Sequence, residues 1–355
     1  MNLDKLGWNS FFQHHLNQLN DNDLIPGRII GVHKNSFSVC NSEHNFNATL
    51  SGLFSYTVNK KSQLPTVGDW VALKDNRIQT ILPRQNALSR GGSGNRNKKV
   101  TISTEEQLIA ANIDSVFVVC GLDRDFNLRR IERYLTLIYN CSLTPVIILT
   151  KKDLHQNVIE FEKRTAEVAI GVSVHTISAK FGDGLAPLQQ YMGIGKTITL
   201  VGSSGVGKST LVNQLVGQKL RTTAQISPSM GEGTHTTTSR DLIMLPNGGI
   251  LIDTPGLREI AFYEDEGGIE VAFEDIAELA LKCRFSDCSH QHEPGCNVQA
   301  ALLTGELTKI RFENYCKMQQ ELAFFTQRQT KSADRIKKER WKQIKVQMRR
   351  YPKYK

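Results

Sequence analysis

The sequence contains no stretch of about 18 apolar residues, the length that a helix needs to cross a membrane. Its longest apolar runs, such as Val116–Cys120 and Val146–Leu149, have the length of single strands. Residues 1–20 lack the continuous apolar core of a signal peptide. These absences argue against a membrane-embedded protein and predict a cytoplasmic one without a membrane partner.

Cysteine is scarce, with seven residues in a chain of 355, and the number is odd. Both observations argue against a disulfide framework in a cytoplasmic protein. Cys120 and Cys141 lie in or beside apolar segments, where cysteine is typical of the core. Internal repeats are also absent, so the chain is not assembled from copies of one unit.

An excess of charge is missing from most of the chain, because residues 1–330 hold 33 basic and 33 acidic residues. The net charge of +9 therefore comes from residues 331–355, which hold 11 Lys or Arg and 2 Asp or Glu. Such a segment is often just a solvated helix face. Its charge density and the aromatic residues within it, Trp341, Tyr351 and Tyr354, favour a polyanion partner such as RNA.

The N-terminal region, residues 1–88, begins with an amphipathic helix over residues 3–19 and continues with five short strands. Five strands in so short a region predict a small β-barrel, for which an OB-fold is the commonest architecture. Another small β-domain fits the pattern nearly as well. Residues 89–104, rich in Gly, Asn and basic residues, are predicted to be a flexible linker. The expected strands are residues 28–32, 37–40, 46–50, 70–73 and 77–82.

Strands and helices alternate over residues 105–268, which predicts an α/β domain with a parallel sheet. Residues 269–311 are predicted to be a helical module with a Cys/His cluster, and residues 312–355 a polar helix that continues into the basic tail. In the α/β domain we expect strands at 113–120, 145–149, 173–177, 197–201 and 250–252, and helices at 128–140, 158–169 and from Lys208 onward.

A phosphate-binding loop of the form G-x-x-x-x-G-K-S follows the strand at 197–201 and opens a helix. Its glycines allow successive backbone N–H groups to face one phosphate, and the helix N-terminus adds partial positive charge. Lys208 is expected to reach the β and γ phosphates, and Ser209 to ligate Mg²⁺. With strand and helix both in place, a coincidental glycine-rich turn is a poor explanation. The predicted nucleotide-binding residues are Gly202, Ser203, Ser204, Gly205, Val206, Gly207, Lys208, Ser209 and Thr210.

Two further motifs indicate that the base is guanine. The sequence T-K-K-D after the strand at 145–149 has the form [NT]-K-x-D, in which the Asp153 carboxylate accepts two N–H bonds that adenine cannot donate. The sequence S-A-K after the next strand matches an element whose backbone contacts guanine O6. An ATPase or a small-molecule kinase with the same phosphate loop would not need Asp153. The predicted base-binding residues are Thr150, Lys151, Lys152, Asp153, Ser178, Ala179 and Lys180.

The switch motifs follow the phosphate loop. The sequence D-T-P-G matches D-x-x-G, in which Asp253 would hold Mg²⁺ through water and the Gly256 N–H would sense the γ-phosphate. One of three consecutive threonines would complete the Mg²⁺ shell, and the sequence does not identify which one. Leu257 stands where many GTPases place a water-orienting glutamine, so we expect His235 or a partner to orient the water. A solvated loop position for His235 is an equal alternative. The threonines are Thr236, Thr237 and Thr238.

The order of these motifs is permuted, since both guanine motifs precede the phosphate loop and the switches. With a β-rich domain in front and a Cys/His module behind, the order resembles the RsgA (YjeQ/YloQ) family of bacterial ribosome-assembly GTPases. The resemblance covers residues 24–303, and residues 233–238, G-T-H-T-T-T, look like that family's switch signature. It implies an OB-fold, a zinc module, binding to the small ribosomal subunit (16S-type rRNA) late in its maturation, and subunit-stimulated GTP hydrolysis. The basic tail and the Gly-rich linker have no close counterpart.

Three cysteines and a histidine within 14 residues form a candidate metal site: Cys283, Cys288, His290 and Cys296. Thiolate and imidazole donors in a tetrahedral set favour structural Zn²⁺, and four protein ligands would close the site. The spacing is not that of a common zinc finger, but it matches the pattern of the resembled family. His292 competes as a ligand, and the family pattern favours His290. A loop with unpaired buried cysteines is the weaker alternative.

Together these patterns predict a monomeric GTPase that uses GTP/GDP, Mg²⁺ and one structural Zn²⁺. Three competing interpretations are an assembly factor in which hydrolysis is incidental, an ATPase or kinase, and a zinc protein that binds DNA. The last of these leaves the phosphate loop unexplained.

Overall fold

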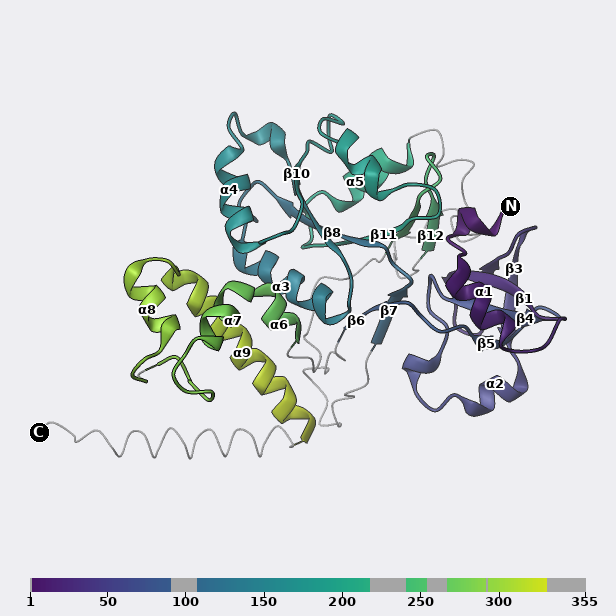
Figure 1. Ribbon diagram of the computed structural model, residues 1–355. Helices are drawn as coiled ribbons and strands as arrows, with labels where there is room; N and C mark the ends of the chain where they lie inside the picture. Colours follow the sequence, from purple (N-terminus) through teal and green to yellow (C-terminus); the bar gives the residue numbers. More distant parts are fainter. Residues whose placement is uncertain (1, 91–106, 218–240, 254–266, 292, 331–355) are drawn as a thin grey trace, which may run out of the picture. The chain divides into compact units, whose positions relative to one another are not determined.

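The computed structural model describes residues 2–90, 107–217, 241–253, 267–291 and 293–330 (Figure 1). The chain divides into two compact units, of which unit 1 holds residues 1–90 and 105–260, and unit 2 holds residues 91–104 and 261–355. Among the described helices, none is both long and apolar enough to span a bilayer.

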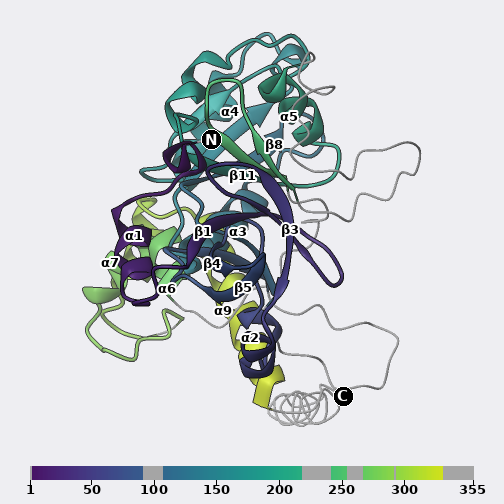
Figure 2. The same ribbon diagram turned by 90° about the vertical axis from the view of Figure 1, so that its right-hand side faces the viewer.

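Five strands near the N-terminus close into a barrel. In it, β1 (Ile25–Val32) pairs antiparallel with both β2 (Phe37–Cys40) and β4 (Trp70–Lys74). The circuit closes because β2 pairs with β3 (Asn45–Leu50), β3 runs parallel to β5 (Arg77–Ile81), and β5 pairs with β4. This five-stranded barrel confirms the predicted OB-fold. Figure 2 shows its strands with α2 (Gly52–Thr57) beside them.

The single helix expected over residues 3–19 is wrong, because the chain breaks at Gly7. A 3₁₀ turn, η1 (Leu3–Leu6), ends there, and α1 (Ser10–Asn17) begins after Asn9, whose side chain accepts from the N–H groups of the first helical turn. Gly7 has φ +85°, and a Cβ atom there would lie 2.8 Å from the Gly195 carbonyl oxygen. A glycine is therefore needed where the N-terminal segment passes close to Gly195.

Unit 1 continues as a three-layer α/β domain (Figure 1). Its parallel strands lie in the order β10, β9, β8, β11, β13, with β12 antiparallel beside β13. The predicted helix at 128–140 and the predicted strand at 197–201 are confirmed to the residue. The strands are β8 (Ser115–Gly121), β9 (Pro145–Thr150), β10 (Val174–Thr176), β11 (Thr197–Val201), β12 (Asp241–Met244) and β13 (Ile250–Asp253), and the helices are α3 (Leu128–Asn140), α4 (Ile159–Val168) and α5 (Lys208–Val216).

The sheet is buried on both faces, which explains why its strands are continuous apolar runs. Every residue of β8 is buried, and its side chains alternate between two cores. Val116 and Val118 join the core beneath α3, whereas Phe117 and Val119 join the core beneath α5. The short 3₁₀ segments of this unit are η2 (Lys61–Gln63), η3 (Lys152–Leu154) and η4 (Ala186–Tyr191).

Two strand pairings connect the barrel to the α/β domain. The hairpin of β6 (Ala87–Arg90) and β7 (Gln107–Ala111) was not expected, and it places residues 89 and 90 of the predicted linker in a strand. The remainder of that linker lies outside the described residues. In addition, β1 pairs antiparallel with β12 at Gly31 and Asp241, so the barrel extends the nucleotide-binding sheet.

A buried arginine lies at this junction. Arg28 of β1 is 1% exposed and donates to the carbonyl oxygens of Leu6, Gly68 (3.3 Å) and Asn112 (3.2 Å). It also donates to the Thr197 hydroxyl, 3.0 Å away at the start of β11. Burial lowers the pKa of Arg28 to about 10, so the guanidinium stays charged at neutral pH. One cation thus connects the N-terminal turn, the barrel and the central sheet.

Arg28→Met should lower the free energy of unfolding by about 3 kcal/mol, because it removes a charged donor from the carbonyl groups of Leu6 and Asn112 and from the Thr197 hydroxyl. Urea denaturation followed by circular dichroism measures the loss. Arg77→Met, an exposed arginine on β5 of the same barrel, is the matched control and should change stability by less than about 0.5 kcal/mol. Equal losses in both variants would contradict a specific role for Arg28.

Unit 2 is helical where it is described. An ion pair at its centre joins Arg311 to Asp275 through both oxygens of the carboxylate, at 2.9 and 3.1 Å. The same guanidinium donates to the Ala272 carbonyl and lies 4.3 Å from the centre of the Phe273 ring, which fastens the last helix to the first two. The helices are α6 (Gly267–Ala272), α7 (Glu274–Leu281), α8 (Asn297–Thr304) and α9 (Lys309–Thr330).

Candidate nucleotide-binding site and metal cluster

The predicted phosphate loop connects β11 to α5. The three glycines of the loop, Gly202, Gly205 and Gly207, have positive φ angles of 148°, 83° and 99°. At Gly202 a Cβ atom would lie 2.3 Å from the Val119 carbonyl oxygen of β8. Only glycine therefore allows the loop to turn so close to the neighbouring strand.

The lysine of the loop is held within it. The Lys208 ammonium donates to the Gly202 carbonyl oxygen at 2.6 Å and to that of Ser203 at 2.5 Å. Its positive charge therefore lies next to the turn of the loop, together with the N-terminus of α5. These features form an anion-binding arrangement.

The first guanine motif meets the phosphate loop directly. Thr150 is fully buried at the end of β9, and its hydroxyl donates to the Val206 carbonyl oxygen at 2.5 Å. The same hydroxyl lies 3.3 Å from the Cys120 carbonyl oxygen of β8. Residues 150 and 206 are 56 positions apart in the sequence, yet the sheet brings them into contact. The two motifs therefore face one site despite their permuted order.

The two guanine motifs are also connected to each other. The Ser178 hydroxyl donates to an Asp153 carboxylate oxygen at 2.5 Å, and this bond lowers the pKa of Asp153. The Lys152 N–H donates to the Ile177 carbonyl oxygen at 3.1 Å. In the second motif, Ala179 is buried and Lys180 is exposed. The Asp153 carboxylate is thus ionised and oriented beside the second motif.

Sequence analysis missed two acidic residues on the loop between β8 and α3. The Asp123 carboxylate forms an ion pair with the Lys151 ammonium at 2.5 Å, and this bond lowers the pKa of Asp123. Asp125 forms an ion pair with Arg130, whose Nη1 lies 2.6 Å from the Ser203 hydroxyl of the phosphate loop. A signal was available, because this loop leaves the carboxyl end of a central parallel strand, where ligands bind in such sheets.

The D-x-x-G aspartate, Asp253, lies at the end of β13, directly opposite Asp241 of β12. Burial and the Asp241 carboxylate raise the pKa of Asp253, and the Lys208 ammonium opposes the rise. Two adjacent carboxylates next to the phosphate loop suit a nearby cation. Ser209 lies exposed in the first turn of α5. The other predicted switch residues lie outside the described residues: His235, Thr236, Thr237, Thr238, Gly256 and Leu257.

Comparison with known families agrees with this geometry. The family profile described as RsgA GTPase matches residues 81–263, more than half of the chain. The chain belongs to the RsgA GTPase family. Membership in the RsgA family makes it a GTP-hydrolysing enzyme that uses guanine nucleotide and Mg²⁺. The sequence-based resemblance is thereby confirmed.

Two curated RsgA relatives cover almost the whole chain, and both are called small ribosomal subunit biogenesis GTPase RsgA. The protein of Syntrophotalea carbinolica is 41% identical, over 99% of this chain and 98% of its own. That of Opitutus terrae is 39% identical, over 97% of this chain and 96% of its own.

Solved structures show the same permuted architecture. YjeQ from Thermotoga maritima has a TM-score of 0.62 and 29% identity, over 84% of this chain and 99% of its own. YloQ, described as a circularly permuted GTPase, has a TM-score of 0.59 and 25% identity, over 85% of this chain and 96% of its own.

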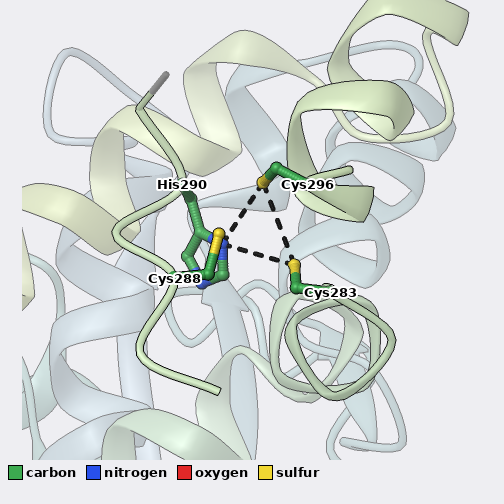
Figure 3. A group of neighbouring side chains, drawn as sticks. All are labelled: Cys283, Cys288, His290 and Cys296. Atoms are coloured by element: carbon green, nitrogen blue, oxygen red, sulfur yellow. Dashed lines mark hydrogen bonds between the residues drawn. The ribbon is translucent and has the colours of Figure 1, made fainter. Parts of the chain in front are cut away.

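The predicted metal ligands of this RsgA protein gather into one cluster between α7 and α8 (Figure 3). The ligand atoms of Cys283, Cys288, His290 and Cys296 all lie within 4.8 Å of one another. The His290 Nδ1 atom is 3.6 Å from the Cys283 sulfur and 3.4 Å from the Cys296 sulfur. The alternative ligand, His292, lies outside the described residues. One four-coordinate ion could bind all four atoms.

Local structure fixes the direction of these ligands. His290 has a φ of 58°, a left-handed turn that directs its ring at the sulfur atoms. Its carbonyl oxygen accepts from the Gln299 side chain at 2.5 Å, and the Cys296 sulfur accepts from the Gln299 N–H at 3.4 Å. Burial and the neighbouring cysteines raise the pKa of Cys288 to about 11. Because a metal binds thiolates, a cation would reverse this effect, so the donor set fits a metal ion.

Thr150→Val should lower the free energy of unfolding by about 1–3 kcal/mol, because valine has the same shape but leaves the Val206 carbonyl group without its donor. Urea denaturation measures the change. Thr80→Val is the control, since that hydroxyl lies on a barrel strand and donates to the carbonyl oxygen of the next residue, Ile81, at 3.4 Å. If Thr150→Val unfolds at the same urea concentration as the parent, the hydroxyl does not fasten the two motifs.

Proposed function

We propose that this RsgA-family protein binds the rRNA of the small ribosomal subunit late in its maturation, in the cytoplasm, and that the subunit stimulates its GTP hydrolysis. The contact between Thr150 and Val206 carries the proposal, because it joins the guanine motif to the phosphate loop in permuted order. The names of the relatives supply the partner, since they are small-ribosomal-subunit biogenesis GTPases.

The nucleotide would bind across the carboxyl edge of the parallel sheet. Asp153 would read guanine N1 and N2, the stem of Lys151 would cover the base, and the second guanine motif would contact O6. At the other end, Lys208 would exchange the carbonyl groups of the loop for phosphate oxygens. Ser209 would ligate Mg²⁺, and Asp253 would hold the ion through water.

Hydrolysis would be slow in the free protein, because Leu257 replaces a water-orienting glutamine. His235 or a group of the ribosome would then orient the attacking water. One of Thr236, Thr237 and Thr238 would complete the Mg²⁺ shell, and the Gly256 N–H would sense the γ-phosphate.

Permutation gives the switches a route to the rest of the molecule. The D-x-x-G motif at residues 253–256 lies about 30 residues before the metal cluster in the sequence. Ordering of the switch by GTP, and its release after hydrolysis, would then act on the helical module and the basic tail. Nucleotide state would thereby set the affinity for RNA.

The metal cluster would hold one structural Zn²⁺. Three thiolates and an imidazole are the donors that zinc prefers, and four protein ligands leave no open position for catalysis. The ion would stabilise the connection between α7 and α8, which otherwise contains little regular structure.

GTP turnover with and without purified small ribosomal subunits tests the proposed function. We expect at least about tenfold stimulation, since a partner-supplied group can contribute far more than this in related GTPases. The stimulation should weaken between about 50 and 200 mM salt, because binding to RNA releases counterions. Large ribosomal subunits are the control. Equal stimulation by both subunits, or by neither, would contradict the proposal.

Zinc binding is tested by elemental analysis of purified protein. The parent protein should hold about one zinc ion per chain, and Cys288→Ser should reduce this to a small fraction, because it removes one of four ligands. Cys316→Ser is the matched control, since Cys316 lies on α9 outside the cluster and should leave zinc content unchanged. The idea fails if the parent is purified without zinc after expression in zinc-supplemented medium.

A further inference from the structure

A charged side chain on α3 reaches the phosphate loop from outside the known motifs. Arg130 lies in the first turn of α3, where its own N–H donates to the Asn127 cap at 3.2 Å. Its guanidinium forms an ion pair with Asp125 and lies 2.6 Å from the Ser203 hydroxyl. The Arg130 side chain is 36% exposed and that of Asp125 is 29% exposed, so this arginine is only partly accessible to water.

The Ser203 hydroxyl has a second partner on the same helix. Tyr134, four residues after Arg130, is 7% exposed; burial raises the pKa of its hydroxyl, and the neighbouring Ser203 side chain opposes the rise. Residues at this spacing lie on one face of a helix, so both side chains reach the loop together. Ser203 therefore has two side chains of α3 beside it, and Arg130 donates to its hydroxyl.

Holding Ser203 affects the lysine that binds phosphate. The carbonyl groups of Gly202 and Ser203 accept the hydrogen bonds of the Lys208 ammonium. A displacement of Ser203 would move one of these carbonyl groups directly. The contacts thus connect Arg130 to Lys208 through a single residue.

The loop needs such anchors because it is rich in glycine, which has high conformational entropy when free. Two features of the sheet already confine it: the Val119 carbonyl oxygen leaves room only for a glycine at position 202, and the Thr150 hydroxyl binds the Val206 carbonyl group. The hydroxyl of Ser203 supplies a third, and its bond to a guanidinium is charge-assisted. A loop that is already ordered loses less entropy when it closes on phosphate.

We propose that Arg130 is a positioning residue for nucleotide binding: with Asp125 and Tyr134 it holds Ser203 and keeps the phosphate loop in its binding conformation. The β-phosphate is common to GDP and GTP, so the effect should extend to both nucleotides. The proposal depends on guanine-nucleotide binding and not on the ribosomal partner.

Equilibrium binding of GDP and of a non-hydrolysable GTP analogue tests the role of Arg130. Arg130→Gln and Ser203→Ala should each weaken both nucleotides by about tenfold, the effect expected for loss of one charged hydrogen bond. The double variant should be no weaker than Ser203→Ala alone, because that change already removes the contact with Arg130. The kcat of Arg130→Gln at saturating GTP should stay within about twofold of the parent value, since Arg130 does not touch the reacting atoms.

Arg129→Gln is the matched control, because it makes the same substitution at an exposed position of the same helical turn and should leave both affinities unchanged. Arg130→Lys keeps the charge without the planar fork and should lie between parent and Arg130→Gln. Thermal unfolding of each variant confirms that the protein compared is folded.

Three results would overturn the proposal. Weakening confined to the GTP analogue, or a loss in kcat alone, would mean that Arg130 contacts the γ-phosphate itself. Additive effects of Arg130→Gln and Ser203→Ala would mean that the two side chains act separately. Unchanged nucleotide affinities in folded Arg130→Gln and Arg130→Lys proteins would mean that Arg130 only stabilises the N-terminus of α3.

Discussion

The nucleotide site depends on one constraint: the carboxyl ends of neighbouring parallel strands meet at one edge of a sheet. The buried hydroxyl of Thr150, bonded to the Val206 carbonyl group, is the point at which this constraint becomes a contact between motifs. Nothing in that geometry depends on which strand comes first along the chain. A permuted polypeptide can therefore place the guanine motifs and the phosphate loop around one ligand, as strands β8, β9 and β11 do here.

Local patterns made much of this architecture predictable. The run Val116–Cys120 is apolar at every position because β8 has a core on each face, and this is what identifies a central parallel strand. The chemistry-bearing motifs were recognisable because each is contiguous in sequence. The prediction of one helix over residues 3–19 was wrong because of a tertiary contact. The chain needs a glycine at position 7, where it passes close to Gly195, which lies far away in the sequence.

Arg28 and Arg130 were missed by sequence analysis because their roles also depend on tertiary contacts. Arg28 is an ordinary strand arginine until the fold encloses it among carbonyl groups from three separate segments. Arg130 belongs to no phosphate-binding motif, and its bond to Ser203 joins residues 73 positions apart. Contacts of this kind depend on how elements pack, so composition and periodicity carry no record of them. The metal cluster is the opposite case, because its four ligands lie within one short segment, where residue type and the resemblance to the RsgA pattern identified them.

The pairing of β1 with β12 has a consequence for how the protein can be divided. In the intact chain the barrel covers the open side of β12, the last strand of the nucleotide-binding sheet. Removing the barrel would uncover backbone groups on the edge of β12, whose first residue, Asp241, lies opposite Asp253. Uncovered strand edges promote self-association between chains. The barrel therefore shields this strand edge of the GTPase domain from other chains. A GTPase domain without the barrel would be prone to aggregate even if every nucleotide-binding residue were retained.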